Sequence, residues 1–280
     1  MAGIANDDAL LTRIVAAIGA VPGVAAVVLG GSRARGTAHA ASDYDIGLYY
    51  WADRPIDTAA LGQAVEGLDE SDPPARVTAI GEWGANMDGG GWLHVGGHAV
   101  DLLYRELGRV EAAIEDGRRG GVRPLYQPGH PHAFLSTIPM GEIAICQPLL
   151  DRDGVVAGLQ ARTRPYPPAL TQGICRLFLW EAEFAVANAR KAVPRGDLVH
   201  VVGCGYRAVA CLAQVLFALE GRYLINEKGA VAEAAGFRYS PRHWRERVEG
   251  AFVDLAAGRF EAGLAGLAGL HAETARLAGC

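Results

Sequence analysis

The stretch at residues 27–50, VVLGGSRARGTAHAASDYDIGLYY, constrains the fold more than any other part of the chain. A short apolar run at 24–29 ends in a Gly-Gly-Ser turn, which is typical of a buried strand bounded by glycines. A second apolar run at 44–51 predicts another strand, with Asp43 and Asp45 at its start. Because side chains alternate between the two faces of a strand, both carboxylates point to the same face. Like charges on one face repel, so a positive partner is expected beside them.

A third acid occurs in similar surroundings. Asp101 lies between apolar residues in HAVDLLYRE, although Asp is depleted in strands and costly to bury without a partner. Three carboxylates on neighbouring strands would form an all-oxygen site. Such a site suits a hard cation such as Mg²⁺, which usually also binds substrate phosphates. Two ions held in this way can assist an in-line displacement at phosphorus.

The Gly30-Gly31-Ser32 turn suits a phosphate group. Glycine lets backbone N–H groups approach an anion closely, and the Ser32 hydroxyl can donate a further hydrogen bond. Arg33 and Arg35 follow directly and add positive charge. Taken alone, each piece is more often a tight turn, a cap or an ordinary ion pair. The combination of turn, paired acids and a later lone acid favours a binding site.

The chain changes character near residue 169. Before it, short strand patterns alternate with helical ones, which predicts an α/β (α+β) domain with a mixed sheet. RTRPYPPAL at 161–169 has the composition of a linker. After it, helical spacing dominates in segments 174–193, 205–220, 227–235 and 242–277, the last of them predicted as more than one helix. We therefore predict a catalytic domain over 1–166 and an all-α bundle over 167–280.

Three local features can be tested directly. Asp7 or Asp8 is expected to cap a first helix that ends near Ala20. The segment ARVTAIGEWG at 75–84 alternates enough to predict a strand. Gly96-Gly97 interrupts a longer strand pattern, which indicates a hairpin or a bulge.

Charge and cysteine content narrow the class of protein. The formal net charge of −5 and the pI of about 5.9 argue against a broad basic surface, and the aromatic residues are not interleaved with basic runs. Nucleic-acid binding is therefore disfavoured as the main function. The five cysteines include no C-x-x-C pair, which is typical of reduced thiols in a cytoplasmic protein.

No targeting or membrane segment is expected. The N-terminus, MAGIANDDALL, lacks the basic region of a secretory signal. The longest apolar stretch, at 208–220, is too short to span a bilayer and predicts a buried helix instead.

The segment GGSRARGTAHAASDYDIGLYY resembles the signature of nucleotidyltransferases of the DNA polymerase β-like superfamily. That signature has an apolar residue, Gly, then Gly or Ser, a spacer of about ten residues, and Asp-apolar-Asp-apolar. It falls here on residues 29–32 and 43–46, with Tyr44 where an aliphatic residue is commoner. Asp101 matches the third acid of the family. The helical half resembles the bundle of aminoglycoside and lincosamide nucleotidyltransferases.

The resemblance implies a reaction. The phosphates of a nucleoside triphosphate would lie at Gly31 and Ser32, and Asp43 and Asp45 would hold Mg²⁺, as two ions. Asp101 would complete the metal site or take the proton of an acceptor hydroxyl. That hydroxyl attacks the α-phosphorus, and pyrophosphate leaves. Positioning and charge neutralisation supply most of the catalysis in such reactions.

The helical half is expected to supply part of the acceptor site. Some relatives use a Glu outside the metal triad as general base, for which Glu181 is the first candidate, with Glu183 and Glu142 as alternatives. Lys191 could reach the triphosphate, or it could simply be a favourable charge near a helix C-terminus. The nucleotide-binding residues predicted in this way are Gly30, Gly31, Ser32, Arg35 and Lys191.

Two other motifs have plainer interpretations. His130 and His132 in GHPHAF suggest a metal, but a tetrahedral zinc site needs further His or Cys ligands and none lies nearby in the sequence. We expect a loop, either lining the cleft or on the surface. The G-x-G-x-x-A pattern at 203–208 fits dinucleotide binding only in a βαβ unit, which is not evident here. It is interpreted as a pair of glycines in helix packing, although DLVHVV before it could be a strand.

The leading prediction is a Mg²⁺-dependent enzyme that transfers a nucleoside monophosphate to a hydroxyl of a small molecule, such as an aminoglycoside-like compound. One alternative is a transferase that modifies a protein or a transfer RNA, since antitoxin-like relatives carry a similar GSRARG segment. A second is a nucleotide-binding module without catalysis. A monomer and a homodimer are both compatible with the sequence.

Overall fold

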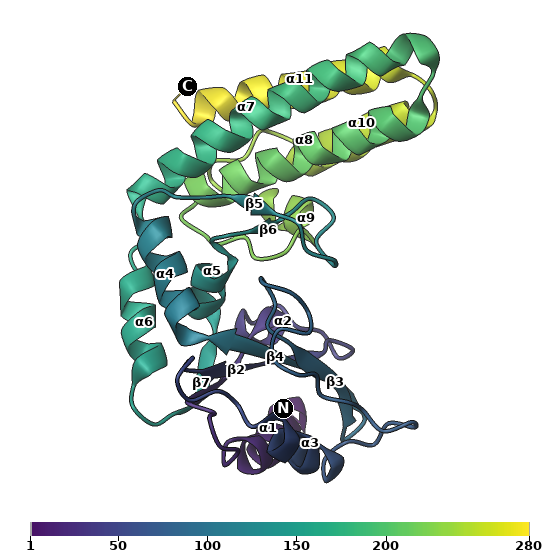
Figure 1. The fold of residues 1–280 in the computed structure, drawn as a ribbon. Helices are drawn as coiled ribbons and strands as arrows, with labels where there is room; N and C mark the ends of the chain where they lie inside the picture. The colour runs from purple at the N-terminus through teal and green to yellow at the C-terminus, as the bar shows by residue number, and fades with distance from the viewer. Residues whose placement is uncertain (1, 280) are drawn as a thin grey trace. The chain divides into compact units, whose positions relative to one another are not determined.

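The computed structural model describes residues 2–279, and in the first helix it describes side chains from residue 9 onward. The chain divides into two compact units (Figure 1). The first, here the sheet unit, comprises the chain up to Glu115 and Pro139–Arg164. The second, here the helical unit, comprises Asp116–Ile138 and the chain from Pro165 onward. The division differs from a single boundary at 166, because residues 116–138 pack with the later helices.

The sheet unit is built on five strands in the order β3-β4-β2-β1-β7. Strands β2 and β4 are parallel and the other neighbouring pairs are antiparallel, so the sheet is mixed, as the sequence predicted. The strands are β1 (Ala26–Leu29), β2 (Tyr44–Tyr50), β3 (Gly90–Val95), β4 (His98–Glu106) and β7 (Gln147–Asp151).

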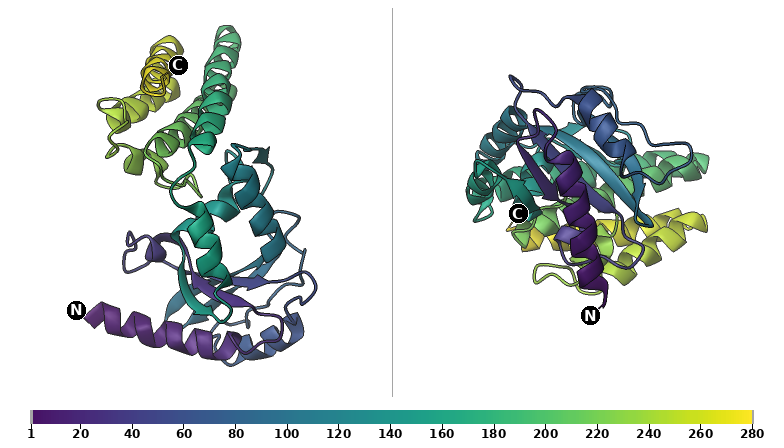
Figure 2. Two further views of the ribbon diagram at one scale, coloured as in Figure 1. Left: turned by 90° about the vertical axis from the view of Figure 1, so that its left-hand side faces the viewer. Right: turned by 90° about the horizontal axis from the view of Figure 1, so that it is seen from below.

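One face of the sheet forms the core. Helices α1 (Ala2–Ile18) and α3 (Thr58–Glu66) cover this face (Figures 1 and 2). They pack on every second residue of β2 and β4, including Tyr44, Ile46 and Leu102. Because the side chains alternate, Asp45 points to the opposite face.

The remaining helices of the sheet unit lie between the strands or, in the case of α6, after the last strand. Helix α2 is a single turn directly after β1, and α4 follows β4 without a break. The helices are α2 (Gly31–Ala34), α4 (Leu107–Arg118), α5 (Ile138–Ile145) and α6 (Val155–Thr163), of which α4 ends and α5 begins at the border with the helical unit.

The helical unit contains α7 (Pro168–Ala192), α8 (Leu198–Leu219), α9 (Ala230–Ala234), α10 (Trp244–Ala256) and α11 (Phe260–Leu277). It also contains the 3₁₀ turn η1 (Val193–Arg195) and the short pair β5 (Pro124–Leu125) and β6 (Phe134–Leu135). The segment predicted at 242–277 is two helices, as expected.

Helix α8 corrects two expectations. It includes DLVHVV from Leu198 onward, so that segment is not a strand. Of the two glycines predicted to pack, Gly205 lies close to Leu255 and Leu267 of the neighbouring helices, whereas Gly203 is exposed with open space beside it. With 22 residues the helix is long and apolar enough to cross a membrane, whereas the 208–220 stretch alone was judged too short. However, 72% of its most apolar window is buried inside the protein, which is typical of a core helix.

The local predictions have mixed outcomes. Helix α1 begins at Ala2, so Asp7 and Asp8 lie within it and the predicted cap is wrong. Residues 75–84 form no strand, because only Thr78 N bonds to β3, at Gly90 O (2.8 Å), and the chain then turns. The hairpin is confirmed. Its two turn residues, Gly96 and Gly97, have φ of 59° and 78°, as a type I′ turn requires.

Candidate active site

The first part of the site is the close approach between the glycine turn and β2. Gly30 N donates to the backbone oxygen of Asp45 (2.7 Å), which fixes the turn against the strand. Gly31 has φ of +58°, and a Cβ on it would collide with the Asp45 carboxylate, 2.6 Å from Cγ. The Asp45 side chain therefore occupies the space that any other residue at position 31 would fill. This explains the glycine at that position.

The second part is the pairing of two acids across the parallel strands. Asp45 of β2 and Asp101 of β4 are register partners, and both are half-buried. Register partners in a sheet point to the same face, so both side chains lie on the face away from α1 and α3. The two acids therefore lie on neighbouring strands, as the sequence predicted.

Asp43 lies just before β2 and is exposed. Arg33 holds its backbone: Nε donates to the Asp43 carbonyl (3.1 Å) and an Nη donates to the Ser42 carbonyl (2.7 Å). The same guanidinium stacks on the Tyr44 ring, 3.6 Å from its centroid. Arg33 is thus a clamp on the loop that carries Asp43, a role that the sequence analysis missed. The aromatic residue between the two acids was the available signal, because a flat ring offers a surface to an arginine.

A buried ion pair lies further along the same face of the sheet. Arg105 of β4 is the register partner of Tyr49 and makes two hydrogen bonds of 2.7 Å to Glu142 of α5. Its side chain is only 5% exposed. Burial lowers the pKa of the Arg105 guanidinium, but the Glu142 carboxylate outweighs this and the pKa is raised overall. Glu142, an alternative candidate for the general base, is therefore engaged in a structural pair.

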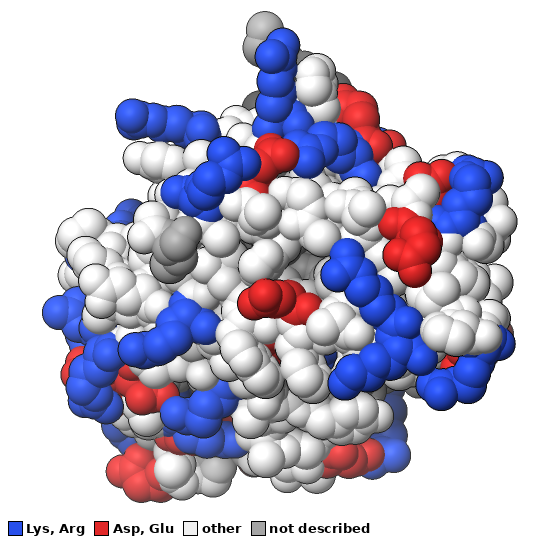
Figure 3. Space-filling view, turned by 90° about the horizontal axis from the view of Figure 1, so that it is seen from above, with Lys and Arg blue, Asp and Glu red and all other residues white. Residues whose placement is uncertain are grey.

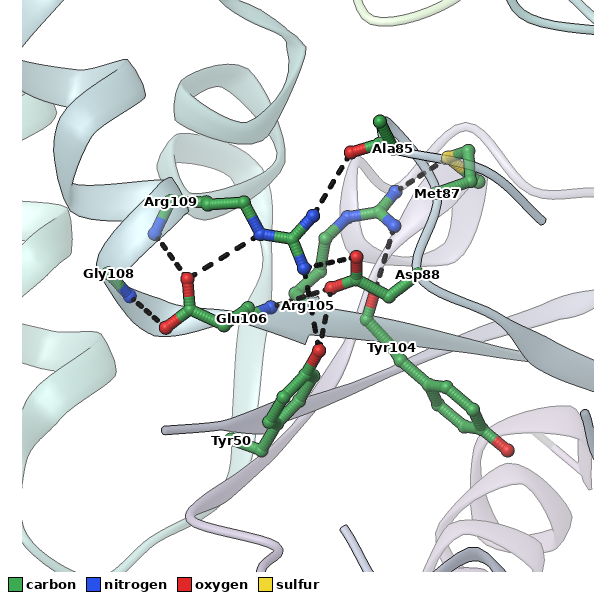
Figure 4. Close-up of polar contacts among 9 residues, drawn as sticks. All are labelled: Tyr50, Ala85, Met87, Asp88, Tyr104, Arg105, Glu106, Gly108 and Arg109. Carbon is green, nitrogen blue, oxygen red and sulfur yellow. Dashed lines mark hydrogen bonds and ion pairs between the residues drawn. The ribbon is translucent and has the colours of Figure 1, made fainter. Parts of the chain in front are cut away.

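A second polar network closes the carboxyl-terminal ends of β2 and β4 (Figure 4). The buried Asp88 carboxylate accepts from Arg109, from Tyr50 Oη (3.1 Å) and from Glu106 N (3.1 Å). Glu106 in turn accepts from Gly108 N and Arg109 N (2.7 and 2.8 Å), which caps the start of α4. Burial and the neighbouring Asp88 raise the pKa of Tyr50 to about 12. These acids are neutralised by partners within the fold.

Comparison with known proteins concerns the region of the glycine turn and the acids of β2. Residues 11–78 match the family model described as the nucleotidyltransferase domain. The matched segment is similar to nucleotidyltransferase domains. It contains the glycine turn, Asp43 and Asp45, and it ends before Asp101. The match confirms the family resemblance predicted from the motif.

Two further comparisons add little. No curated protein matches the chain. A solved structure described as a nucleotidyltransferase-like protein from Exiguobacterium sibiricum 255-15 aligns over 97% of this chain and 76% of its own, with 11% identity and a TM-score of 0.44. At that TM-score the likeness carries no argument.

Nucleotidyltransferase domains generally use a divalent metal, and the donor chemistry of this site fits one. Carboxylate oxygens are the ligands that Mg²⁺ prefers, and the glycine cradle leaves room for the Asp45 carboxylate. Among the described residues, however, Asp43, Asp45 and Asp101 do not form a group at ligand spacing. The group that does is His132, Glu181 and Cys211 of the helical unit, whose donor atoms lie within 4.8 Å of one another.

The other predicted site residues lie in different settings. Gly30 caps the single turn α2, within which Ser32 lies, and half-buried Arg35 follows it. Lys191 is exposed in the last turn of α7, where it is a favourable charge for the helix end. Its contact with a nucleotide stays a prediction.

Glu181 of α7 is buried rather than solvated. Its Oε1 lies 2.6 Å from Arg207 Nε and 3.3 Å from His132 Nε2. Burial raises the pKa of the Glu181 carboxyl, but these two partners outweigh it and lower the pKa overall. A lower pKa makes the carboxylate a weaker base. Glu183 is exposed on the same helix, and the choice of general base stays a prediction.

Surface charge bears on the nucleic-acid alternative. On the face drawn in Figure 3, basic side chains form separate groups with acidic and uncharged residues between them. A nucleic-acid enzyme is expected to have a basic track that leads to Asp43 and Asp45. The face in Figure 3 shows no continuous track.

Proposed function

We propose that the protein is a Mg²⁺-dependent nucleotidyltransferase that transfers a nucleoside monophosphate from a nucleoside triphosphate to a hydroxyl group of a small molecule. The observation that carries the proposal is the packing of the Asp45 carboxylate on Gly31, with Asp101 at the same register on the next strand. The nucleotidyltransferase match over the turn and the first two acids supports it.

In this proposal the residues have separate roles. Asp43, Asp45 and Asp101 hold Mg²⁺ through carboxylate oxygens. Bound there, Mg²⁺ would neutralise the phosphate charge and the like charges of the acids. The glycine turn and Ser32 receive the phosphates, with Arg35 as an added positive charge and Lys191 as a further candidate from the helical unit. Arg33 holds the loop of Asp43 in place.

The reaction is a substitution at phosphorus. The acceptor hydroxyl oxygen forms a bond to the α-phosphorus, and the bond from that phosphorus to the bridging oxygen of the β-phosphate breaks. Pyrophosphate leaves, and the hydroxyl proton passes to a carboxylate, for which Asp101 is the candidate. Correct positioning of the two reactants supplies much of the rate in such a reaction.

The acceptor is proposed to be a small polyhydroxylated or cationic compound of the aminoglycoside type, bound by the helical half. The size of the helical unit supports this, because a unit of this size can form an acceptor pocket of its own. The net charge of −5 suits a cationic acceptor better than a nucleic acid.

The test is pyrophosphate release with ATP, GTP, CTP and UTP in turn, with and without Mg²⁺. The acceptor panel contains aminoglycosides, lincosamides and bulk transfer RNA. Release that requires Mg²⁺ and one small-molecule class is expected, and Asp45→Asn should abolish it. Release only with transfer RNA would support the alternative acceptor class. Full activity of the folded Asp45→Asn variant would contradict the site assignment.

A further inference from the structure

A second cluster of reactive side chains lies inside the helical unit. It joins His132 of the loop before β6, Glu181 of α7 and Cys211 of α8. His132 Nε2 lies 3.3 Å from Glu181 Oε1 and 3.4 Å from Cys211 Sγ. The sequence predicts no metal at His132, because no further ligands lie nearby along the chain. The fold supplies them from residues 49 and 79 positions away.

The spacing of these atoms fits a tetrahedral metal centre. Bonds of about 2.0–2.1 Å to nitrogen, 2.0–2.2 Å to oxygen and 2.3 Å to sulfur place tetrahedral ligand atoms roughly 3.3–3.6 Å apart. The two distances that involve His132 Nε2 fall at that spacing. The third pair lies within the 4.8 Å that encloses all three atoms.

The cluster is buried and held by further contacts. The side chains of His132 and Glu181 are 1% and 8% exposed, and Cys211 is buried. Glu227 anchors the His132 loop, because its Oε1 accepts from the backbone N–H groups of His132 and Ala133 (3.0 and 3.2 Å). Arg207 donates to Glu181 from the outer side. Such second contacts commonly orient metal ligands in proteins.

Hydrogen bonds and a cation are two ways to hold these three side chains. Without a metal, His132 Nε2–H and the Cys211 thiol can both donate to the Glu181 carboxylate. With a metal, the nitrogen, the oxygen and the sulfur would each offer a lone pair to the same cation.

We propose that His132, Glu181 and Cys211 form a binding site for a borderline-soft divalent cation of the zinc type, with a fourth position left for a water molecule. Nitrogen, sulfur and one carboxylate favour zinc over magnesium, which prefers oxygen ligands alone. Binding converts the Cys211 thiol to a thiolate and releases one proton to solvent. The two ligand charges then balance the divalent ion, and Arg207 stays paired with Glu181. The proposal is independent of the proposed nucleotidyl transfer.

The test is titration of the full-length, chelator-treated and reduced protein with Co²⁺, followed by competition with Zn²⁺. We expect one Co²⁺ per chain, with the intense visible bands of a tetrahedral centre and a thiolate-to-cobalt charge-transfer band. Cys204→Ser is the matched control on the same helix. The Cys204 sulfur lies 3.5 Å from His200 Nε2 on a more exposed part of α8, where the metal could bind adventitiously.

The charge-transfer band should persist in Cys204→Ser and disappear in Cys211→Ser, and Glu181→Gln should weaken binding at least tenfold. If Cys211→Ser fails to fold by circular dichroism, the wild-type spectrum decides together with Cys204→Ser. Absence of the band in the wild-type protein would overturn the proposal. A band that is lost in Cys204→Ser would overturn it as well, because the metal would then lie at the exposed pair.

Discussion

The two ends of the β2–β4 strand pair differ in how the charged residues there are arranged. At the carboxyl-terminal end, Arg105 and Glu142 form a pair with two hydrogen bonds, and Asp88 accepts from Arg109. At the amino-terminal end, two acids, Asp45 and Asp101, lie side by side at one register. Oppositely charged side chains pair at one end, whereas two acids share a register at the other, where we propose that Mg²⁺ binds. We therefore expect substitutions at the first end to change stability and those at the second to change activity.

The largest effect on activity is expected at the amino-terminal end. Asp45→Asn removes a carboxylate charge but keeps the shape, so nucleotidyl transfer should fall by about 10³-fold, the scale of losing a major electrostatic group in a site. The variant should still fold, because asparagine has nearly the size and shape of aspartate. A loss of stability large enough to explain the loss of activity would show that Asp45 supports the fold and not catalysis.

The largest effect on stability is expected at the carboxyl-terminal end. Glu142→Gln leaves the Arg105 charge buried without its anionic partner, which should lower the free energy of unfolding by about 3–5 kcal/mol. Chemical denaturation measures this directly. The activity of the folded fraction should stay near that of the wild type. Loss of activity without loss of stability would place Glu142 in the active site.

The glycine turn offers a paired test. Gly31→Ala should reduce transfer by roughly 10²-fold, because a Cβ there collides with Asp45 and displaces the carboxylate. Gly36→Ala is the control, since Gly36 also has positive φ (+71°) but has nothing within 4 Å of the added Cβ. Both variants should lose a similar 1–2 kcal/mol of stability from backbone strain. Equal activity of the two variants would contradict the proposal that close packing of Asp45 on Gly31 is needed for transfer.

A smaller effect is expected from the Arg33 clamp. Arg33→Lys keeps the charge but loses the planar fork that contacts two carbonyls and stacks on Tyr44. We expect a decrease in kcat of about tenfold and a higher Mg²⁺ requirement, because the loop of Asp43 is less well positioned. Measurement of kcat over a range of Mg²⁺ concentrations tests this. An increase in KM for the nucleotide alone would point to direct phosphate binding by Arg33.

The smallest expected effect is on stability, at Asp69, whose carboxylate accepts hydrogen bonds from backbone N–H groups. Partial burial raises its pKa, but hydrogen bonds from His94 N and Ala75 N (2.8 and 2.7 Å) outweigh this and lower it. A depressed pKa stabilises the fold above the unfolded value of about 3.9, and the contribution is lost as the pH falls through the folded value. Asp69→Asn should cost roughly 1 kcal/mol at pH 7 and less below pH 4. A difference in unfolding midpoint that grows as the pH falls would contradict this sign.

The sequence was sufficient for features that depend on local patterns. The strand with Asp45, the hairpin at Gly96-Gly97 and the helices after residue 168 follow from alternation, turn chemistry and helical spacing. The strand predicted at 75–84 failed because alternation does not guarantee a partner strand. Only Thr78 of that segment bonds to the sheet.

Features that depend on distant partners could not be predicted. Arg105 meets Glu142 across 37 residues, and His132 meets Cys211 across 79. No local spacing indicates such pairs, because folding alone brings them together. The same reason explains why Glu181 was expected as a free base and is found paired with Arg207.

The most direct test of the central claim is nucleotide binding, which does not require the acceptor to be known. A nonhydrolysable nucleoside triphosphate would be titrated calorimetrically into the wild-type, Asp45→Asn and Glu142→Gln proteins, with and without Mg²⁺. The account predicts saturable Mg²⁺-dependent binding that is lost in Asp45→Asn and retained in folded Glu142→Gln. Binding that is unchanged in Asp45→Asn would contradict the assignment of the like-charged end of the sheet as the active site.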